Sequence, residues 1–159
     1  MGTGFDAHRL VPGRPLLLGG VRIVHDRGLH GHSDGDCLVH AVCDALLGAA
    51  ALGDMGRHFP SSDPRFKGAS SLTFLDEVAR LIAAEGLRVA NLDATVIAEA
   101  PRLLAYLDAM RRSLAERLAI DVKQVSVKAK STDGLGALGR GEGIAAQAVV
   151  LLTSKDVQT

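Results

Sequence analysis

The chain has 159 residues, of which 47% are hydrophobic and 23% charged, a composition typical of one globular domain, which we expect to span residues 1–159. Eighteen basic and 18 acidic residues give a formal net charge of zero. This balance, together with 3% aromatic residues and no Trp, argues against nucleic acid and an anionic membrane surface as partners. No apolar run reaches the roughly 18 residues of a membrane helix, so we expect no membrane span.

We expect no signal peptide, because chemically distinctive residues begin at once with Gly4-Phe5-Asp6-Ala7-His8. Cys37 and Cys43 fall in one predicted helix with diverging side chains, so no disulfide is expected. Both observations favour the cytoplasm of a bacterium, or a plastid if a transit peptide has been removed.

The first fifty residues predict short strands followed by a helix. Residues 1–8 form an expected edge strand, in which Asp6 and His8 point to the same side because side chains alternate along a strand. Residues 16–18 and 21–24 predict a hairpin. A helix is expected from residue 34 to about residue 51, with Ser33 and Asp36 spaced as a capping box.

The remainder alternates helices with strands. Residues 57–69 contain two prolines and no periodic pattern, which is typical of a functional loop. The other expected elements are a helix over 70–85, a strand over 89–98, a helix with Pro101 in its first turn, and strands over 125–130 and 144–152. This order predicts an α+β fold, with a ferredoxin-like sheet covered on one face by helices.

The helix that begins near residue 34 carries a polar stripe. Asp36, His40 and Asp44 follow at intervals of four, while the opposite face is apolar. His40 with Asp6 and His8 would make a set of two nitrogens and one oxygen, which is the pattern of a catalytic zinc site with an open fourth position. The alternative is that Asp6 caps a turn and both histidines are satisfied polar residues.

Other polar motifs have two interpretations each. Ser33 and the amides that open the helix could bind an anion or simply form the cap. Asp54 could hold sugar hydroxyls or make a turn. The segment 131–133 could serve a phosphate and a hard cation or be an ordinary loop. Arg140 could clamp an anion or be solvated, and Lys128 and Lys130 are typical of a solvated strand face.

Taken together, five motifs resemble the 2-C-methyl-D-erythritol 2,4-cyclodiphosphate synthase family of the non-mevalonate isoprenoid pathway. They are Gly4-Phe5-Asp6-Ala7-His8, His32-Ser33-Asp34-Gly35-Asp36 through His40, the run from Asp44 to Asp54, Phe66-Lys67-Gly68-Ala69, and Gly139-Arg140-Gly141-Glu142-Gly143-Ile144. The resemblance covers nearly the whole chain.

The resemblance implies a homotrimer with active sites between subunits. It also implies a lyase that cyclises 4-diphosphocytidyl-2-C-methyl-D-erythritol 2-phosphate and releases CMP. By the family pattern Asp6, His8 and His40 hold one Zn2+ per subunit, and Asp133 holds a second cation, Mg2+ or Mn2+. His32 and Ser131 match positions assigned to transition-state stabilisation.

The resemblance also assigns substrate contacts. Asp54 and Gly56 match a ribose-binding turn near Asp44, residues 59–63 match a flexible loop over the erythritol, and residues 98–104 match a cytosine pocket supplied by the neighbouring subunit. The full set of expected substrate-binding residues is Asp6, His8, His32, Ser33, Asp44, Asp54, Gly56, Phe59, Pro60, Ser61, Ser62, Asp63, Ala98, Glu99, Ala100, Pro101, Arg102, Leu103, Leu104, Lys130, Ser131, Thr132, Asp133 and Arg140.

The sequence departs from the family pattern in three places that matter for the site. Asp133 stands where Glu is usual, Lys130 where hydroxyl-rich residues are common, and Ala137 where an aromatic residue often lines the trimer's central cavity. Some relatives bind an isoprenoid diphosphate in that cavity, and without the aromatic residue the resemblance does not extend to this ligand. The alternatives to a lyase are a phosphohydrolase that uses the same metals and a trimeric binding module without turnover.

Overall fold

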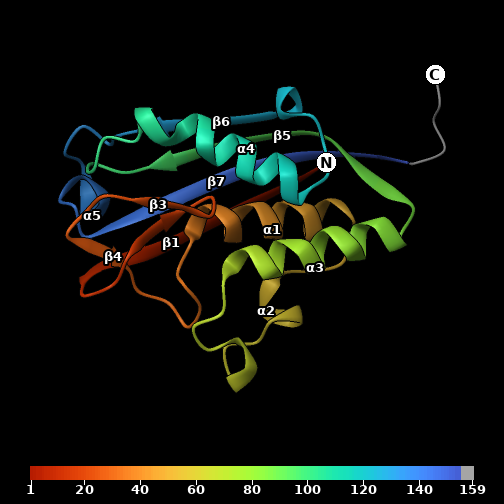
Figure 1. The fold of residues 1–159 in the computed structure, drawn as a ribbon, viewed down its shortest axis with the longest axis horizontal. Coiled ribbons are helices and arrows are strands. Elements are labelled where there is room, and N and C mark those ends of the chain that lie inside the picture. The colour runs from red at the N-terminus through yellow and green to blue at the C-terminus, as the bar shows by residue number, and fades with distance from the viewer. Residues whose placement is uncertain (155–159) are drawn as a thin grey trace.

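The computed structural model describes residues 1–154 as a five-stranded sheet with helices packed against one face (Figure 1). The last five residues of the predicted domain, 155–159, lie outside the described residues. The strand order is β4-β1-β7-β5-β6, in which β5 and β6 are parallel and the other neighbours antiparallel. The mixed α+β fold expected from the sequence is confirmed.

The strands are β1 (Gly2–Pro12), β2 (Leu16–Leu18), β3 (Val21–Ile23), β4 (Arg27–Leu29), β5 (Leu87–Ile97), β6 (Val125–Lys130) and β7 (Gly143–Ser154). The helices are α1 (Cys37–Ala49), α2 (Met55–His58), α3 (Ser71–Ala84), α4 (Leu107–Arg117) and α5 (Gly136–Gly139), with 3-10 turns at Pro64–Phe66, Leu104–Tyr106 and Val122–Gln124. None of the helices within residues 1–154 is long and apolar enough to cross a membrane.

Helix α1 is the centre of the molecule. It packs on β1 and β7 on one side and on α3 on the other, and every residue from Cys37 to Leu47 is buried except His40 and Asp44. His40 and Asp44, two members of the predicted polar stripe, are therefore the only residues from Cys37 to Leu47 that reach a cavity or solvent. An all-round apolar helix is typical of a position inside the core.

Two glycines let β1 approach α1 closely. A Cβ on Gly4 would lie 2.1 Å from the carbonyl oxygen of Ala41, and a Cβ on Gly2 would lie 2.3 Å from that of Ala45. Because alternate residues of a strand share a face, Asp6 and His8 point from β1 toward α1 as well. The close packing thus brings the acid–histidine pair of β1 against His40.

The strands agree with the sequence except in two places: β4 forms where a loop through Gly28 is expected, and β1 is longer than expected. Residues Gly2–Arg9 pair with β7 and the last part of β1 with β4, so the predicted edge strand continues to Pro12. The predicted hairpin forms as β2 and β3. Its β2 side contacts α1 and its β3 side contacts α4, so the hairpin lies between these two helices.

Two helix predictions need correction. Pro101 does not open a helix: its peptide bond with Ala100 is cis, and α4 begins only at Leu107 after a 3-10 turn. Helix α1 begins at Cys37 rather than near residue 34, because Asp36 and not Ser33 is its N-cap. Helix α3 matches its prediction over Ser71–Ala84.

Among residues 1–154, the face of the sheet away from the helices is open to solvent. Large apolar side chains are exposed there: Phe5 is 61% exposed, Leu151 49% and Val149 38%. Exposed apolar patches of this kind on a sheet are typical of an interaction surface.

Candidate active site

Asp6, His8 and His40 form the only cluster of three potential metal ligands among residues 1–154. Asp6 Oδ2 lies 2.8 Å from His8 Nε2 and 2.9 Å from His40 Nδ1, and the two nitrogens are 3.2 Å apart. Burial raises the pKa of Asp6, but its hydrogen bonds with His40 and His8 outweigh burial and hold the pKa well below its ordinary value. The interaction with Asp6 raises the pKa of His8 against the effect of burial.

The donor set and its geometry fit a small divalent cation. Zinc bonds to nitrogen and carboxylate oxygen of about 2.0–2.1 Å imply tetrahedral edges of about 3.3 Å between ligand atoms. The three observed separations lie slightly below that value. Two half-buried rings and one carboxylate already converge on one point, so a cation would need only small outward shifts.

Helix α1 is capped by Asp36 rather than by Ser33. The Asp36 carboxylate is 1% exposed and accepts from Val39 N–H at 3.0 Å, which caps the helix, and from Gly19 and Gly20 N–H at 2.9 and 2.7 Å. The Asp36 carboxylate thus takes the capping role that the sequence analysis offered to Ser33 and ties the β2–β3 turn to the helix. Ser33, also buried, accepts from Gly35 N–H instead of capping the helix.

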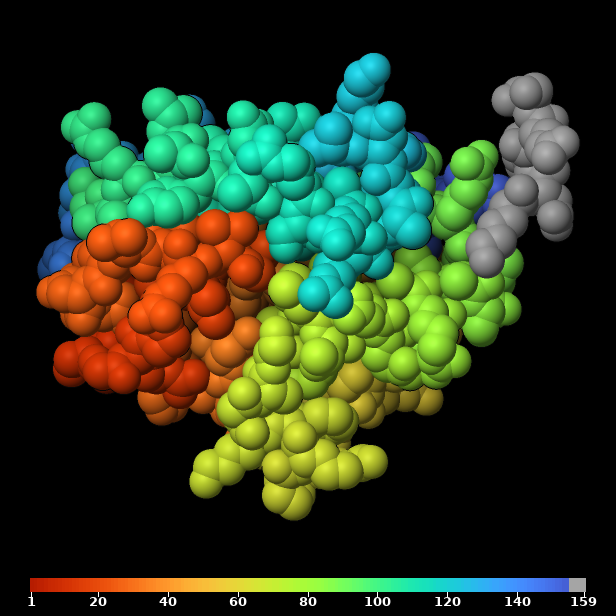
Figure 2. Space-filling model, viewed as in Figure 1, coloured from red at the N-terminus to blue at the C-terminus, as the bar shows by residue number. Residues whose placement is uncertain are grey.

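A cavity of about 210 Å³ lies against the metal cluster. Several predicted site residues line it together: His8, His32, Ser33, His40, Phe59 and Ser61. Phe59 stacks on Phe74 at 4.7 Å between ring centroids, and Phe66 meets both rings edge-on at 5.6 and 5.5 Å. These aromatic contacts attach the segment 59–66 to α3, and this segment projects from the body of the molecule (Figure 2).

The predicted ribose turn lies beside this cavity. Asp44 Oδ1 accepts from Met55 N–H at 2.8 Å, and Met55 lines the cavity. Burial raises the pKa of Asp44, opposed by that hydrogen bond. Asp54 caps α2 through Arg57 N–H at 3.0 Å and is exposed, as is Gly56. The polar stripe of α1 thus continues into this turn.

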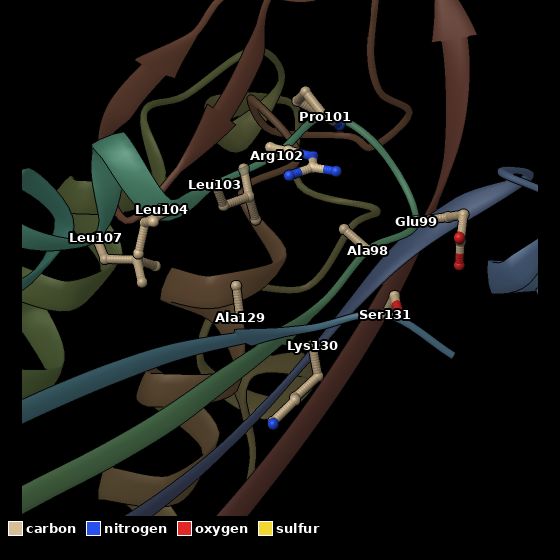
Figure 3. Close-up of a pocket in the computed structure, with 10 residues that line it drawn as sticks. All are labelled: Ala98, Glu99, Pro101, Arg102, Leu103, Leu104, Leu107, Ala129, Lys130 and Ser131. Atoms are coloured by element: carbon tan, nitrogen blue, oxygen red, sulfur yellow. The ribbon is translucent and has the colours of Figure 1, made fainter. Parts of the chain in front are cut away.

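A second cavity, of about 420 Å³, is lined by residues of the predicted cytosine pocket and by Ser131 (Figure 3). Its lining residues come from the segment after β5, the start of α4 and the end of β6: Ala98, Glu99, Pro101, Arg102, Leu103, Leu104, Leu107, Ala129, Lys130 and Ser131. The predicted cytosine pocket and Ser131 therefore meet in one place. Glu99 Oε2 accepts from Gly134 N–H at 3.4 Å, which links the two loops.

The two cavities are separate within one chain. Asp6 on β1 and Ala129 on β6 lie at the same level of the sheet but three strands apart, a lateral distance of about 14 Å. The β2–β3 hairpin between α1 and α4 also separates them. Asp133 and Arg140 are exposed, and Arg140 pairs with Glu142 at 2.7 Å, so neither residue joins the metal cluster.

Several lining residues were not predicted as part of the site: Met55, Phe66, Phe74 and Leu107. Phe74 could have been found from the helical period of α3, where Phe74, Val78 and Ile82 are buried together. Met55 and Phe66 carry no comparable periodic signal.

A model of the YgbB family matches residues 1–153. The chain belongs to the YgbB family. A relative from Moorella thermoacetica named 2-C-methyl-D-erythritol 2,4-cyclodiphosphate synthase is 58% identical over 156 residues, which are 98% of this chain and 96% of the relative. The resemblance noted in the sequence is thereby confirmed.

Solved structures agree with this membership in the YgbB family. The bifunctional IspDF from Campylobacter jejuni matches with a TM-score of 0.93 and 42% identity over 96% of this chain, although this chain spans only 42% of that one. A 2C-methyl-D-erythritol-2,4-cyclodiphosphate synthase in a CDP-bound form matches with a TM-score of 0.88 and 39% identity, covering 96% of this chain and 99% of that one.

Proposed function

We propose that the Asp6–His8–His40 cluster is the divalent-metal centre of a cyclodiphosphate synthase. The chain is a phosphorus–oxygen lyase of isoprenoid biosynthesis, which converts 4-diphosphocytidyl-2-C-methyl-D-erythritol 2-phosphate to 2-C-methyl-D-erythritol 2,4-cyclodiphosphate and CMP. A 2-phosphate oxygen bonds to the β-phosphorus, and the bond from that phosphorus to the CMP oxygen breaks. The observation that carries the proposal is the convergence of the three ligand atoms beside a cavity, in a chain of this family.

The chemistry requires positioning more than a strong base, because the attacking phosphate is already anionic. Well-oriented intramolecular reactions reach effective molarities of about 10⁵–10⁸ M, so holding one folded substrate conformer supplies much of the rate. Bound at the cluster, Zn2+ would act as a Lewis acid that polarises a phosphoryl oxygen. His32 lines the same cavity and would donate a hydrogen bond to a reacting phosphate of the substrate.

The aromatic segment over the first cavity would exclude water from the reacting phosphates. Phe59 and Phe66 form its apolar wall, and Ser61 adds a hydroxyl. Exclusion of water favours the internal phosphate as nucleophile over hydrolysis. This wall supports cyclisation over the phosphohydrolase alternative.

The second cavity would bind the cytidine end of the substrate. A solved relative with a CDP-bound form supports a cytidine nucleotide as ligand. Ser131 lines this cavity and would contact the diphosphate, and Asp133 in the same loop would hold Mg2+ or Mn2+ together with substrate oxygens. Asp133 has one methylene fewer than the usual Glu, which leaves room for a water between the carboxylate and the cation.

We infer that the enzyme is a homotrimer in which each site joins two chains. Two observations support this arrangement: the hairpin and about 14 Å of sheet separate the two cavities in one chain, and the uncovered sheet face exposes Phe5, Val149 and Leu151. A neighbour that covers this face would bring its second cavity to the first cavity of the adjacent chain. A measured mass of one or two chains in solution would contradict the trimer.

Three finer assignments belong to the same proposal. The ferredoxin-like description rests on the sheet order, in which β7 lies between β1 and β5 and these two strands are parallel to each other. The two final strands, β6 and β7, are joined by the four-residue helix α5 rather than by a helix of full length. Residues 1–159 would form a single domain. A cytoplasmic location is supported by the buried, unpaired Cys37 and Cys43, which suit a reducing compartment.

The test is incubation of the purified protein with the proposed substrate, Zn2+ and Mg2+, followed by 31P NMR. We expect the cyclic diphosphate to appear together with CMP. A linear phosphorylated erythritol would instead show a phosphohydrolase, and unchanged substrate would show a binding module; either result would contradict the proposal.

A further inference from the structure

The side of the His40 ring that faces away from the cluster makes a second set of contacts. His40 Nε2 lies 2.8 Å from Ser71 Oγ and 3.2 Å from Ser33 Oγ. Ser71 is the first residue of α3 and is fully buried. Its hydroxyl also contacts the Asp34 carboxylate through a short hydrogen bond to Oδ1. The chain of contacts therefore runs from Asp34 through Ser71 to His40, opposite the proposed metal.

The directions of these hydrogen bonds follow from the groups involved. A carboxylate accepts and has no proton to donate, so the Ser71 hydroxyl must donate to Asp34. A hydroxyl has one proton, and Ser71 Oγ therefore offers only lone pairs to His40. The Ser71 contact, at 2.8 Å, is the shorter of the two serine contacts of Nε2, and an Nε2 without a proton would face an acceptor there, so this contact favours a proton on Nε2.

This assignment decides which nitrogen of His40 is free. A histidine that ligates a cation is a neutral imidazole with one proton, so a proton on Nε2 leaves the Nδ1 lone pair for a cation at the cluster. Nδ1 is the atom that lies 2.9 Å from Asp6 Oδ2 and 3.2 Å from His8 Nε2. The contact from Ser71 thus selects the tautomer that can ligate a metal at the cluster.

The carboxylate of Asp34 is itself held in place. Its Oδ2 accepts from Ser71 N–H at 2.9 Å, and its Oδ1 also accepts from Asp36 N–H at 3.2 Å. Asp34 N–H donates to the carbonyl of Ala69 at 3.0 Å, just before α3. Asp34 therefore connects the loop before α1 to the start of α3 and fixes the orientation of the Ser71 hydroxyl.

We propose that Ser71 and Asp34 are positioning residues for the metal centre, acting together to hold His40 as the Nε2–H tautomer with Nδ1 directed at the cation. The inference rests on the proposed metal centre at Asp6, His8 and His40. Groups that orient a ligating histidine typically change metal affinity by about 10- to 100-fold when removed.

The first experiment compares Zn2+ affinity of the full-length wild type, Ser71→Ala and Ser70→Ala by competition with a chromogenic chelator. Ser70 is the matched control, because it is the neighbouring exposed serine and its side chain makes no cap hydrogen bond. We expect Zn2+ to bind Ser71→Ala at least about tenfold more weakly than wild type and Ser70→Ala to be unchanged. An effect of less than threefold in Ser71→Ala overturns the inference.

The second experiment observes the tautomer directly in protein with 15N-labelled histidine. In the Zn2+-loaded wild type we expect the His40 proton on Nε2; a proton on Nδ1 overturns the inference without any variant. Asp34→Asn keeps the side-chain size but can donate to Ser71 and reverse the hydroxyl, so we expect weaker Zn2+ binding there as well. Thermal unfolding without metal checks that each variant folds.

The two proposals fail differently. If the wild type binds no Zn2+, the proposed metal centre is wrong. If the wild type binds Zn2+ and Ser71→Ala binds it equally well, only the positioning role is wrong.

Discussion

The close contact between β1 and α1 gives a prediction that joins stability to the metal site. In Gly4→Ala the new Cβ would lie 2.1 Å from Ala41 O and 2.7 Å from Ala45 N, both backbone atoms of a buried helix. The helix and the strand must separate by roughly 1 Å to remove the overlap, and overpacking of this kind costs about 1–3 kcal/mol. His40 precedes Ala41 and moves with it, whereas Asp6 stays with the strand.

A metal centre tolerates errors of only about 0.2 Å in ligand distance, so the same displacement should also weaken Zn2+ binding. For Gly4→Ala we expect a loss of about 2–3 kcal/mol in the free energy of unfolding without metal, measured by urea denaturation, and at least tenfold weaker Zn2+ binding. Gly48→Ala is the matched control, because its Cβ would lie 4.0 Å from Thr3 O; we expect it to be neutral or stabilised by up to about 1 kcal/mol. If Gly4→Ala unfolds and binds Zn2+ like wild type, the reasoning is refuted.

Three further predictions concern the helix cap, the metal and the thiols. Asp36→Ala leaves three backbone N–H donors without their acceptor, so it should lower the free energy of unfolding, measured in urea, by about 3 kcal/mol or more. The control Asp121→Ala removes an exposed cap and should cost about 1 kcal/mol or less. Equal losses in the two variants would contradict the role of Asp36. Removal of the metal by a chelator should abolish cyclisation by the wild type, and added Zn2+ should restore it. His40→Ala should stay inactive with Zn2+ and keep the circular dichroism spectrum of the wild type. Normal turnover by His40→Ala would refute the ligand set. Burial raises the pKa of both Cys37 and Cys43, so neither thiol should react with Ellman's reagent at pH 8 until the protein is unfolded, and rapid reaction in the native state would contradict the packing of α1.

Much of the fold could be predicted because its elements carry strong periodic patterns. The alternation along β5 and the apolar period of α3 are local signals, and both elements were found close to their bounds. The start of α1 was misplaced because Ser33 and Asp36 are both good caps by type. The choice between them depends on the β2–β3 turn, whose Gly19 and Gly20 amides bind Asp36 and cannot be seen in the local sequence.

The metal cluster shows the same division between local and tertiary information. The spacing of Asp6 and His8 predicts that they share a face, and the stripe on α1 predicts that His40 is not a core residue. Their meeting depends on the glycines of β1, which let the helix approach. Ser71 and Asp34 were not singled out as supports for His40, because their contacts join α3 to a loop 37 residues earlier and follow no period.

The shared active site is the central claim, and mixing two inactive variants tests it most directly. His40→Ala damages the first cavity and Ser131→Ala the second; after unfolding and refolding a 1:1 mixture, 31P NMR measures the cyclic diphosphate formed. With sites between neighbouring chains of a trimer, about one quarter of the sites combine two intact halves, so activity should recover to about a quarter of wild type. Activity no greater than the average of the two separate variants would contradict the account.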